Sequence, residues 1–190
     1  MGLRIVIVGV PGVGKSTVVT KANEAVSGSA VQVFGTAMFE EAQRLKWVKH
    51  RDEMRKLPVE KQKRLQEAAA ARISRGKGKV VFIDTHLFIR TPEGFWPGLP
   101  LSVIQPMKPT HLLLVEASAK EVLARRKNDT TRYRDEITEE EVAQELELAR
   151  SFLTAASLVS GAPMAFIKNG EGQSEKAASK IAELVRGARA

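Results

Sequence analysis

Residues 3–17 read LRIVIVGVPGVGKST, and this stretch decides the fold. Its first six residues are Leu, Ile and Val with a single Arg, which is typical of a parallel strand buried on both faces. Residues 9–16 then satisfy the phosphate-loop pattern G-x-x-x-x-G-K-[ST], and a helix is predicted to follow from residue 15. A strand, a glycine-rich loop and a helix in this order predict an α/β protein that binds a nucleoside triphosphate.

The phosphate loop can bring several backbone N–H groups against one anion. Its glycines let the chain turn tightly, Pro11 has no N–H to offer, and the next helix presents the positive end of its dipole. Lys15 should reach the β- and γ-phosphates of ATP, and Ser16 should hold Mg²⁺. We therefore expect the ATP site to comprise Gly9, Val10, Pro11, Gly12, Val13, Gly14, Lys15, Ser16 and Thr17.

Predicted strands and helices alternate along the whole chain. Apolar runs predict strands at residues 3–8, 31–34, 79–84, 111–116 and 163–168. Helical patterns cover residues 15–26, 36–46, 58–75, 101–105, 119–127, 138–159 and 174–186, and the Gly- and Pro-rich residues 85–100 predict a loop. This alternation predicts one domain, residues 1–190, with a three-layer P-loop NTPase fold: a five-stranded parallel sheet flanked by helices. Ligands of such sheets bind at the carboxyl ends of the strands.

Three of the predicted helices carry signals at their start. Thr36 is a candidate N-cap for the second helix. Pro58 suits the first position of the third helix. Thr138 and Glu141 have the spacing of a capping box, which predicts the start of a long helix.

Composition excludes several classes of site. The chain has no cysteine, so disulfides, thiolate catalysis and zinc–sulfur sites are excluded, and its three histidines are too scattered for a metal motif. The net charge of +8 suits either nucleic acid or an anionic small substrate. Aromatic residues make up only 5% and do not interleave with a basic stripe, so nucleic acid is not an expected partner. No apolar run reaches the ~18 residues of a membrane span, and residues 1–8 lack the apolar core of a signal peptide, so we expect a cytoplasmic protein.

Phosphoryl transfer depends mostly on positioning and charge neutralisation, so arginines are expected near the γ-phosphate. Residues 125–135, RRKNDTTRYRD, supply them. Arg125 and Arg126 end a predicted helix, and Arg132 and Arg134 lie on one side of an extended loop. A short lid at about residues 125–137 could close over the triphosphate and exclude water. A solvated charged loop is the alternative interpretation.

Carboxylates end two predicted strands. Asp84 ends the third strand, where it could orient Mg²⁺ through water together with Ser16, or simply cap a turn. Glu116 ends the fourth strand, and we interpret it as structural. His86 lies just past Asp84 and could contact substrate or a loop carbonyl.

The phosphoryl acceptor should bind opposite the triphosphate, near the second and third strands. Thr36 opens a predicted helix at a strand end, so its hydroxyl and amide could meet a phosphate or a base. Arg55 is the candidate for an acceptor phosphate, with a surface salt bridge as the alternative. Arg90, in the predicted loop beyond Asp84, could also face the acceptor.

The class of P-loop protein follows from what the chain lacks. It has no N-K-x-D motif, which a guanine-binding switch would normally show, and it is too short for a motor or a helicase. A small phosphotransferase fits the length. The alternatives are a P-loop kinase for another nucleotide or a small metabolite, and an ATP-binding regulator associated with nucleic acid.

Further motifs occur in order along nearly the whole chain. They are GVPGVGKST (9–17), FGTAMFE (34–40), RDEMRKL (51–57), DTH (84–86), TPEG (91–94) with GLP (98–100), and RR (125–126) through TRYRD (131–135). As a set they resemble an archaeal-type adenylate kinase. The resemblance implies Mg²⁺-dependent, reversible phosphoryl transfer from ATP to AMP to give two ADP. It also implies a short lid, an AMP-binding region at about residues 35–75 and a homotrimer.

The resemblance also assigns residues by motif. Thr36 and Arg55 would serve AMP, and Arg132 and Arg134 would be lid arginines. Asp84, His86 and Arg90 complete the expected AMP site. The acceptor-loop pattern D-G-F-P-R of longer bacterial and eukaryotic adenylate kinases is absent, because residues 84–90 read DTHLFIR here. The zinc-binding lid of some longer relatives is excluded by the lack of cysteine.

Overall fold

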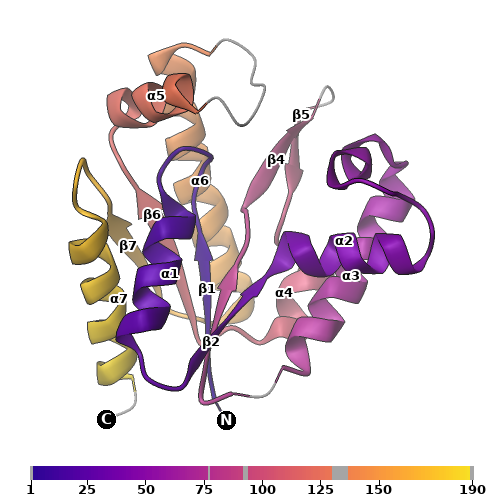
Figure 1. Ribbon diagram of the computed structural model, residues 1–190, viewed down its shortest axis with the longest axis horizontal. Coiled ribbons are helices and arrows are strands. Elements are labelled where there is room, and N and C mark those ends of the chain that lie inside the picture. The colour runs from indigo at the N-terminus through magenta and orange to yellow at the C-terminus, as the bar shows by residue number, and fades with distance from the viewer. Residues whose placement is uncertain (1, 77, 92–93, 130–136, 189–190) are drawn as a thin grey trace.

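A five-stranded parallel sheet forms the centre of the molecule (Figure 1). The computed structural model describes residues 2–76, 78–91, 94–129 and 137–188. The strands are β1 Leu3–Val8, β2 Ser29–Val33, β3 Val80–Asp84, β6 His111–Glu116 and β7 Met164–Lys168, arranged in the order β2-β3-β1-β6-β7. This confirms the predicted fold class.

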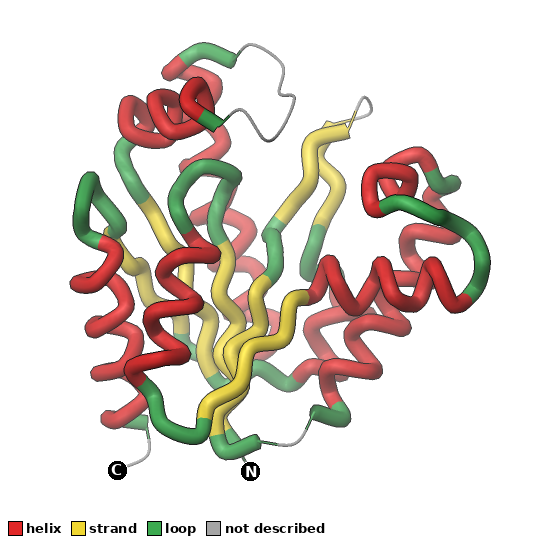
Figure 2. The backbone as a smooth tube through the Cα atoms, viewed as in Figure 1, coloured by secondary structure: helices red, strands yellow, loops and turns green. Residues whose placement is uncertain are grey.

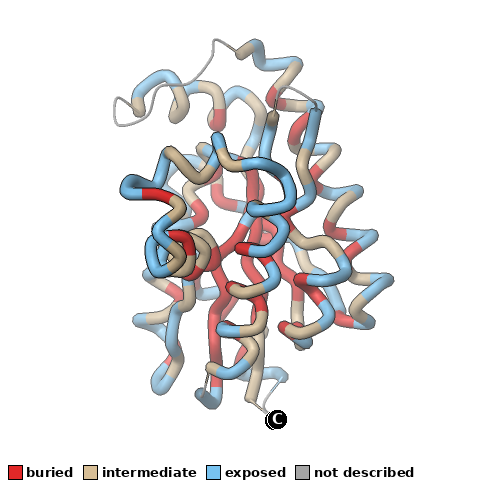
Figure 3. The backbone as a smooth tube through the Cα atoms, turned by 90° about the vertical axis from the view of Figure 1, so that its right-hand side faces the viewer, coloured by how far each residue is buried: buried red, intermediate tan, exposed pale blue. Residues whose placement is uncertain are grey.

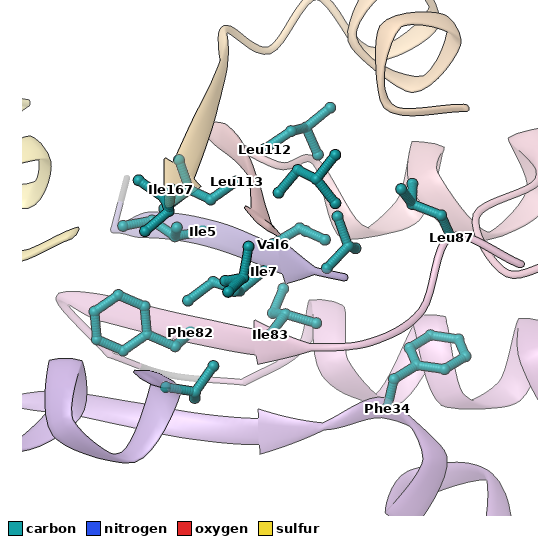
Figure 4. Close-up of a cluster of buried hydrophobic side chains, with 14 of the residues drawn as sticks. Ile5, Val6, Ile7, Phe34, Phe82, Ile83, Leu87, Leu112, Leu113 and Ile167 are labelled. Carbon is teal, nitrogen blue, oxygen red and sulfur yellow. The ribbon is translucent and has the colours of Figure 1, made fainter. Parts of the chain in front are cut away.

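The three central strands are buried on both faces. Every residue of β3 is buried, and so are Ile5–Val8 of β1 and Leu112–Glu116 of β6. Figure 4 shows side chains from these strands packed together with Phe34 and Leu87 from neighbouring segments. Because both faces are covered by helices, these strands are almost continuously apolar, and this is why their bounds were predicted closely from the sequence. Figure 3 shows the buried residues concentrated in the sheet, beneath exposed helical surfaces.

Helices cover the two faces of the sheet. Helices α1 Lys15–Ala25 and α7 Ser174–Gly187 pack against each other on one face. On the other face lie α4 Leu101–Met107 and α6 Glu139–Ser160, and α5 Ala119–Asn128 packs against α6. The predicted capping box of α6 is confirmed, since Thr138 Oγ1 accepts from the Glu141 N–H at 3.2 Å. No helix among the described residues is long and apolar enough to cross a membrane.

A helical lobe extends from the β2 side of the sheet (Figure 1). It consists of α2 Phe34–Arg44, the 3₁₀ helix η1 Arg51–Lys56 and α3 Val59–Ser74. Its outer part has a small apolar cluster of its own, around the buried Ala42, Val48 and Leu65. The lobe coincides with the expected AMP-binding region.

Two expected helix starts differ in the structure. Helix α2 begins at Phe34, directly after β2, with Val33 in the N-cap position and no side-chain cap. Thr36 therefore lies inside the first turn, and its prediction as the N-cap was wrong. Pro58 is the N-cap of α3 rather than its first helical residue. Its fixed backbone conformation suits either position, so the sequence did not separate them.

The region expected to be a loop, residues 85–100, contains a β-hairpin. Strands β4 Phe88–Thr91 and β5 Gly94–Pro97 pair antiparallel and project past the carboxyl edge of the main sheet (Figure 2). Phe88 packs edge-on against Phe95 across the hairpin, with ring centroids 5.0 Å apart, and against Phe152 of α6 at 5.4 Å. Each strand has only four residues, and β5 begins with Gly and ends with Pro, so neither stood out in the sequence. Such a short hairpin is marginal alone, and the contact with α6 helps to hold it.

Candidate active site

The phosphate loop lies between β1 and α1, at the carboxyl edge of the sheet, and α5 and the β4–β5 hairpin lie at the same end (Figure 1). Gly12 and Gly14 have φ values of 91° and 81°, in the left-handed region that favours glycine. A Cβ at Gly12 would lie 3.0 Å from Arg126 Cγ and 3.2 Å from the Val122 carbonyl oxygen. The glycine at position 12 is therefore required both by the backbone conformation and by the close approach of α5.

Side chains from two other segments hold the carbonyl groups of this loop. Arg126 Nε donates to the Pro11 oxygen at 2.8 Å. The Val13 oxygen accepts from Asn169 Nδ2 at 2.7 Å and from Arg125 Nη1 at 3.2 Å. In a planar trans peptide the C=O and the next N–H point in opposite directions. Anchoring the Pro11 and Val13 carbonyls from behind therefore turns the N–H groups of the two following glycines toward the space where a phosphate would bind.

Lys15 and Asp84 form a buried ion pair at the mouth of the loop. Their side chains are 8% and 10% exposed, and Lys15 Nζ contacts Asp84 Oδ1. The two residues meet because β3 pairs with β1, with Asp84 opposite Ile7 at the carboxyl ends of the strands. Ser16 follows Lys15 and is exposed on the first turn of α1. The structure thus brings the expected phosphate-binding lysine to the expected metal-orienting carboxylate.

A second charged cluster lies behind the loop, between α5, α6 and the hairpin. Arg126 Nη2 lies 2.6 Å from Glu145 Oε2, and both side chains are less than a tenth exposed. Arg90 of β4 lies near α6. Its Nε is 3.7 Å from Glu145 Oε1, and its Nη1 is 3.7 Å from Glu141 Oε1. Its guanidinium also stacks on Phe95 at 5.6 Å. Among the described residues, Arg90 forms its ion pairs with α6 and none with the helical lobe.

On the lobe, Thr36 contacts Arg51 rather than Arg55. Arg51 Nη1 lies 3.5 Å from Thr36 Oγ1, at the limit of a hydrogen bond. A Cβ at Gly35 would come within 2.5 Å of Arg51 Nη2, so the glycine makes room for this guanidinium. Arg55 is exposed on η1.

Of the remaining predicted residues, His86 is exposed at the start of the hairpin connection. Arg132, Arg134 and most of the expected lid lie outside the described residues, so their roles stay predictions. Glu116 pairs with Arg150 through two contacts, Oε1 to Nε at 2.6 Å and Oε2 to Nη2 at 3.0 Å, in agreement with a structural role.

Comparisons with known proteins decide the family. Residues 8–143 match the family model described as an AAA domain. The chain is 39% identical over 187 residues to the adenylate kinase of Methanocaldococcus jannaschii, a match that covers 96% of this chain and 97% of the relative. It is 40% identical over 188 residues to that of Pyrococcus horikoshii, covering 97% and 96%. The chain belongs to the adenylate kinase family.

Solved structures support the fold of this adenylate kinase. A shikimate kinase from Acinetobacter baumannii superposes with a TM-score of 0.66 at 14% identity, covering all of this chain and 96% of that one. A shikimate kinase from Aquifex aeolicus gives 0.62 at 18% identity, with 98% of each chain covered. At these identities the likeness shows the fold alone.

Two residues that support the phosphate loop, Asn169 directly and Glu145 through Arg126, were not predicted from the sequence. Asn169 is buried directly after β7, where its backbone N–H donates to the Glu116 oxygen at 2.7 Å. The rule that ligand-binding residues follow strand ends could have found it. Glu145 lies within α6 and belongs to no motif, so nothing in the sequence marked it.

Proposed function

We propose that this adenylate kinase catalyses Mg²⁺-dependent, reversible transfer of the γ-phosphoryl group of ATP to AMP, giving two ADP. The observation that carries the proposal is the Lys15–Asp84 pair at the mouth of a phosphate loop whose carbonyls are held from behind. This arrangement presents amides and an ammonium group to a triphosphate before it arrives. The choice of AMP as the acceptor rests on the family, because relatives at about 40% identity are named adenylate kinase.

On the donor side, Lys15 would exchange partners when ATP binds. Asp84 balances the buried ammonium in the structure, and the β- and γ-phosphates would take over that role because they carry more negative charge. Asp84 would then be available to orient Mg²⁺ through water, together with the Ser16 hydroxyl. Hydroxyl and carboxylate oxygens suit this ion, which usually takes its other ligands from phosphates and water. When bound, Mg²⁺ would neutralise charge on the phosphates.

On the acceptor side, an AMP phosphate oxygen would form the new bond to the γ-phosphorus as the bond to the β–γ bridging oxygen breaks. No proton has to move, so no general base is required. Thr36 and Arg55 are the proposed AMP ligands, and the contact with Thr36 adds Arg51 to them. We propose that Arg125, Arg126, Arg132 and Arg134 stabilise the transferring group electrostatically.

The proposal is tested by a coupled assay of ADP formation with AMP, GMP, CMP, UMP and sugars as acceptors. We expect AMP to be preferred, and Lys15→Ala to lower turnover by about 10²- to 10³-fold, the usual loss for one transition-state contact. Lys21→Ala is the matched control, because Lys21 lies on the same helix and pairs with Glu175 at the surface. A preference for another acceptor would favour the alternative kinase. ATP binding without any acceptor-dependent turnover would favour the regulator.

We also propose that the protein assembles as a homotrimer, a number that rests on the family resemblance. Support for a subunit contact comes from exposed apolar side chains on the last turn of α6 and on the edge strand β7: Leu158, Val159, Met164 and Phe166. Such a surface costs free energy in water and is typical of a contact site. Sedimentation should give three chains for the wild type and fewer for Leu158→Lys. A monomeric wild type would contradict the proposal.

A further inference from the structure

Glu145 is a buried carboxylate of α6 to which no role has been assigned so far. It contacts Arg126, which in turn contacts the phosphate loop. It lies on the inner face of α6, and its side chain is 8% exposed. Its Oε2 accepts from Arg126 Nη2 at 2.6 Å, and Arg126 Nε donates in turn to the Pro11 oxygen at 2.8 Å. One carboxylate, one guanidinium and one loop carbonyl therefore form a continuous chain of hydrogen bonds.

The charge of Arg126 explains why this chain needs Glu145. The Arg126 side chain is only 7% exposed, and a buried guanidinium without a counter-charge is costly. Among the described residues, Glu145 is the one carboxylate that pairs with it. The two contacts engage Nε and Nη2, two of the three guanidinium nitrogens, so the rotamer freedom of a long side chain is lost before the nucleotide binds.

Glu145 also reaches the hairpin. Its second oxygen, Oε1, lies 3.7 Å from Arg90 Nε on β4, and Arg90 is about half exposed. The carboxylate thus lies between the phosphate loop, which is expected to hold the donor, and a hairpin that carries one of the residues expected to face the acceptor. A substitution at Glu145 should therefore change the rate of phosphoryl transfer as well as the stability of the fold.

We propose that Glu145 is a positioning residue, which holds Arg126 against the phosphate loop in the orientation that serves phosphoryl transfer. The proposal rests on the role proposed above for Arg126. Glu145 itself touches neither nucleotide. Its removal should lower kcat, because Arg126 becomes less ordered. The KM for AMP should change little, because the contact of Glu145 with Arg90 is long, at 3.7 Å, and Arg90 is half exposed.

The first test compares Glu145→Gln with Glu147→Gln in the full chain, measuring kcat, both KM values and thermal unfolding. Gln keeps the shape of Glu but loses the charge that orders Arg126. We expect kcat to fall about tenfold in Glu145→Gln, which corresponds to about 1.4 kcal/mol, with the KM for AMP within about twofold of the wild type. Glu147 is exposed on the same helix, and its substitution should leave kcat unchanged. Wild-type kcat in Glu145→Gln would overturn the proposal.

The second test is a double-mutant cycle with Arg126→Gln, and it applies even if Glu145→Gln folds poorly, because the double variant leaves no buried guanidinium unpaired. If Glu145 acts through Arg126, the double variant should have the kcat of Arg126→Gln alone. A further drop of tenfold in the double variant would show an independent role and overturn the proposal. If Arg126→Gln keeps wild-type kcat, the role of Arg126 fails and this inference fails with it. The AMP-dependent ADP formation of the wild type, measured in the same assay, tests the proposed function separately.

Discussion

The side-chain amide of Asn169 donates to the carbonyl oxygen of Val13 at 2.7 Å and so joins the loop after β7 to the phosphate loop. Arg125 donates to the same oxygen at 3.2 Å, and its Nη2 donates to the Asn169 carbonyl at 3.1 Å. The shape of the phosphate loop therefore depends on contacts from both α5 and the last third of the chain.

Asn169→Ala should weaken both the fold and the binding of ATP. The Val13 oxygen would keep only its bond from Arg125, so we expect a loss of about 1 kcal/mol in unfolding free energy, at the lower end for a buried hydrogen bond. The affinity for ATP should fall with it, because the peptide that carries the N–H of Gly14 is then held by one hydrogen bond instead of two. Denaturant unfolding and calorimetric titration with ATP measure the two effects. Gln105→Ala, at an exposed position on α4, is the control, and equal affinities for ATP in the two variants would contradict the proposed role of Asn169.

Gly12→Ala should cost more than Gly28→Ala, although both positions have positive φ. A Cβ at Gly28 meets nothing within 4 Å, so that variant reports the backbone strain alone, about 1–2 kcal/mol. At Gly12 the same strain is joined by crowding against Arg126 and the Val122 carbonyl. Unfolding free energies of the two variants give the comparison. Equal losses would mean that α5 does not restrict the phosphate loop.

Acid should loosen the connection between α5 and the loop after β7. The Glu121 carboxylate accepts from the Ser118 hydroxyl at 2.6 Å, from the Ser118 N–H at 2.9 Å and from the Glu171 N–H at 2.7 Å. These hydrogen bonds lower the pKa of Glu121 to about 2, and the bond from the Ser118 hydroxyl makes the largest contribution to this shift. Because the folded pKa lies below the usual value of 4.5, the stabilisation is fully present above about pH 4.5 and is lost as the pH falls toward 2.

The measurement for Glu121 is the unfolding free energy of the wild type and of Glu121→Gln between pH 2 and pH 6. We expect the wild type to be the more stable at pH 6 and the difference to shrink as the pH falls. Glu67→Gln, at an exposed position on α3, should show no such trend. A difference between wild type and Glu121→Gln that stays constant over this range would contradict the assignment.

The parts of the fold predicted best are those that depend on local sequence. The expected bounds of β1 and β6 were confirmed, because a strand buried on both faces is apolar throughout. The start of α6 was confirmed through its capping box, which is also a local signal. The hairpin was missed because contacts such as that of Phe88 with Phe152 come from a distant part of the chain.

In the candidate site, too, residues marked by local sequence were foreseen and residues defined by distant contacts were not. The structure brings Lys15 of the phosphate loop to Asp84, as a motif and the rule of strand ends led us to expect, while their roles toward ATP and Mg²⁺ stay predictions. Asn169 and Glu145 were not foreseen, since their importance lies in contacts with the Val13 oxygen and with Arg126 that only the fold creates. The helix start at Phe34 was missed because β2 runs directly into α2 without a side-chain cap.

We propose that the donor and acceptor nucleotides bind face to face across the γ-phosphate. This proposal is tested most directly by calorimetric titration with two adenosines joined by five phosphates, in the presence of Mg²⁺. We expect one molecule to bind per chain, more tightly than ATP, and the saturated protein to lose binding of both ATP and AMP. Binding of this compound that displaces ATP but leaves AMP binding intact would contradict it.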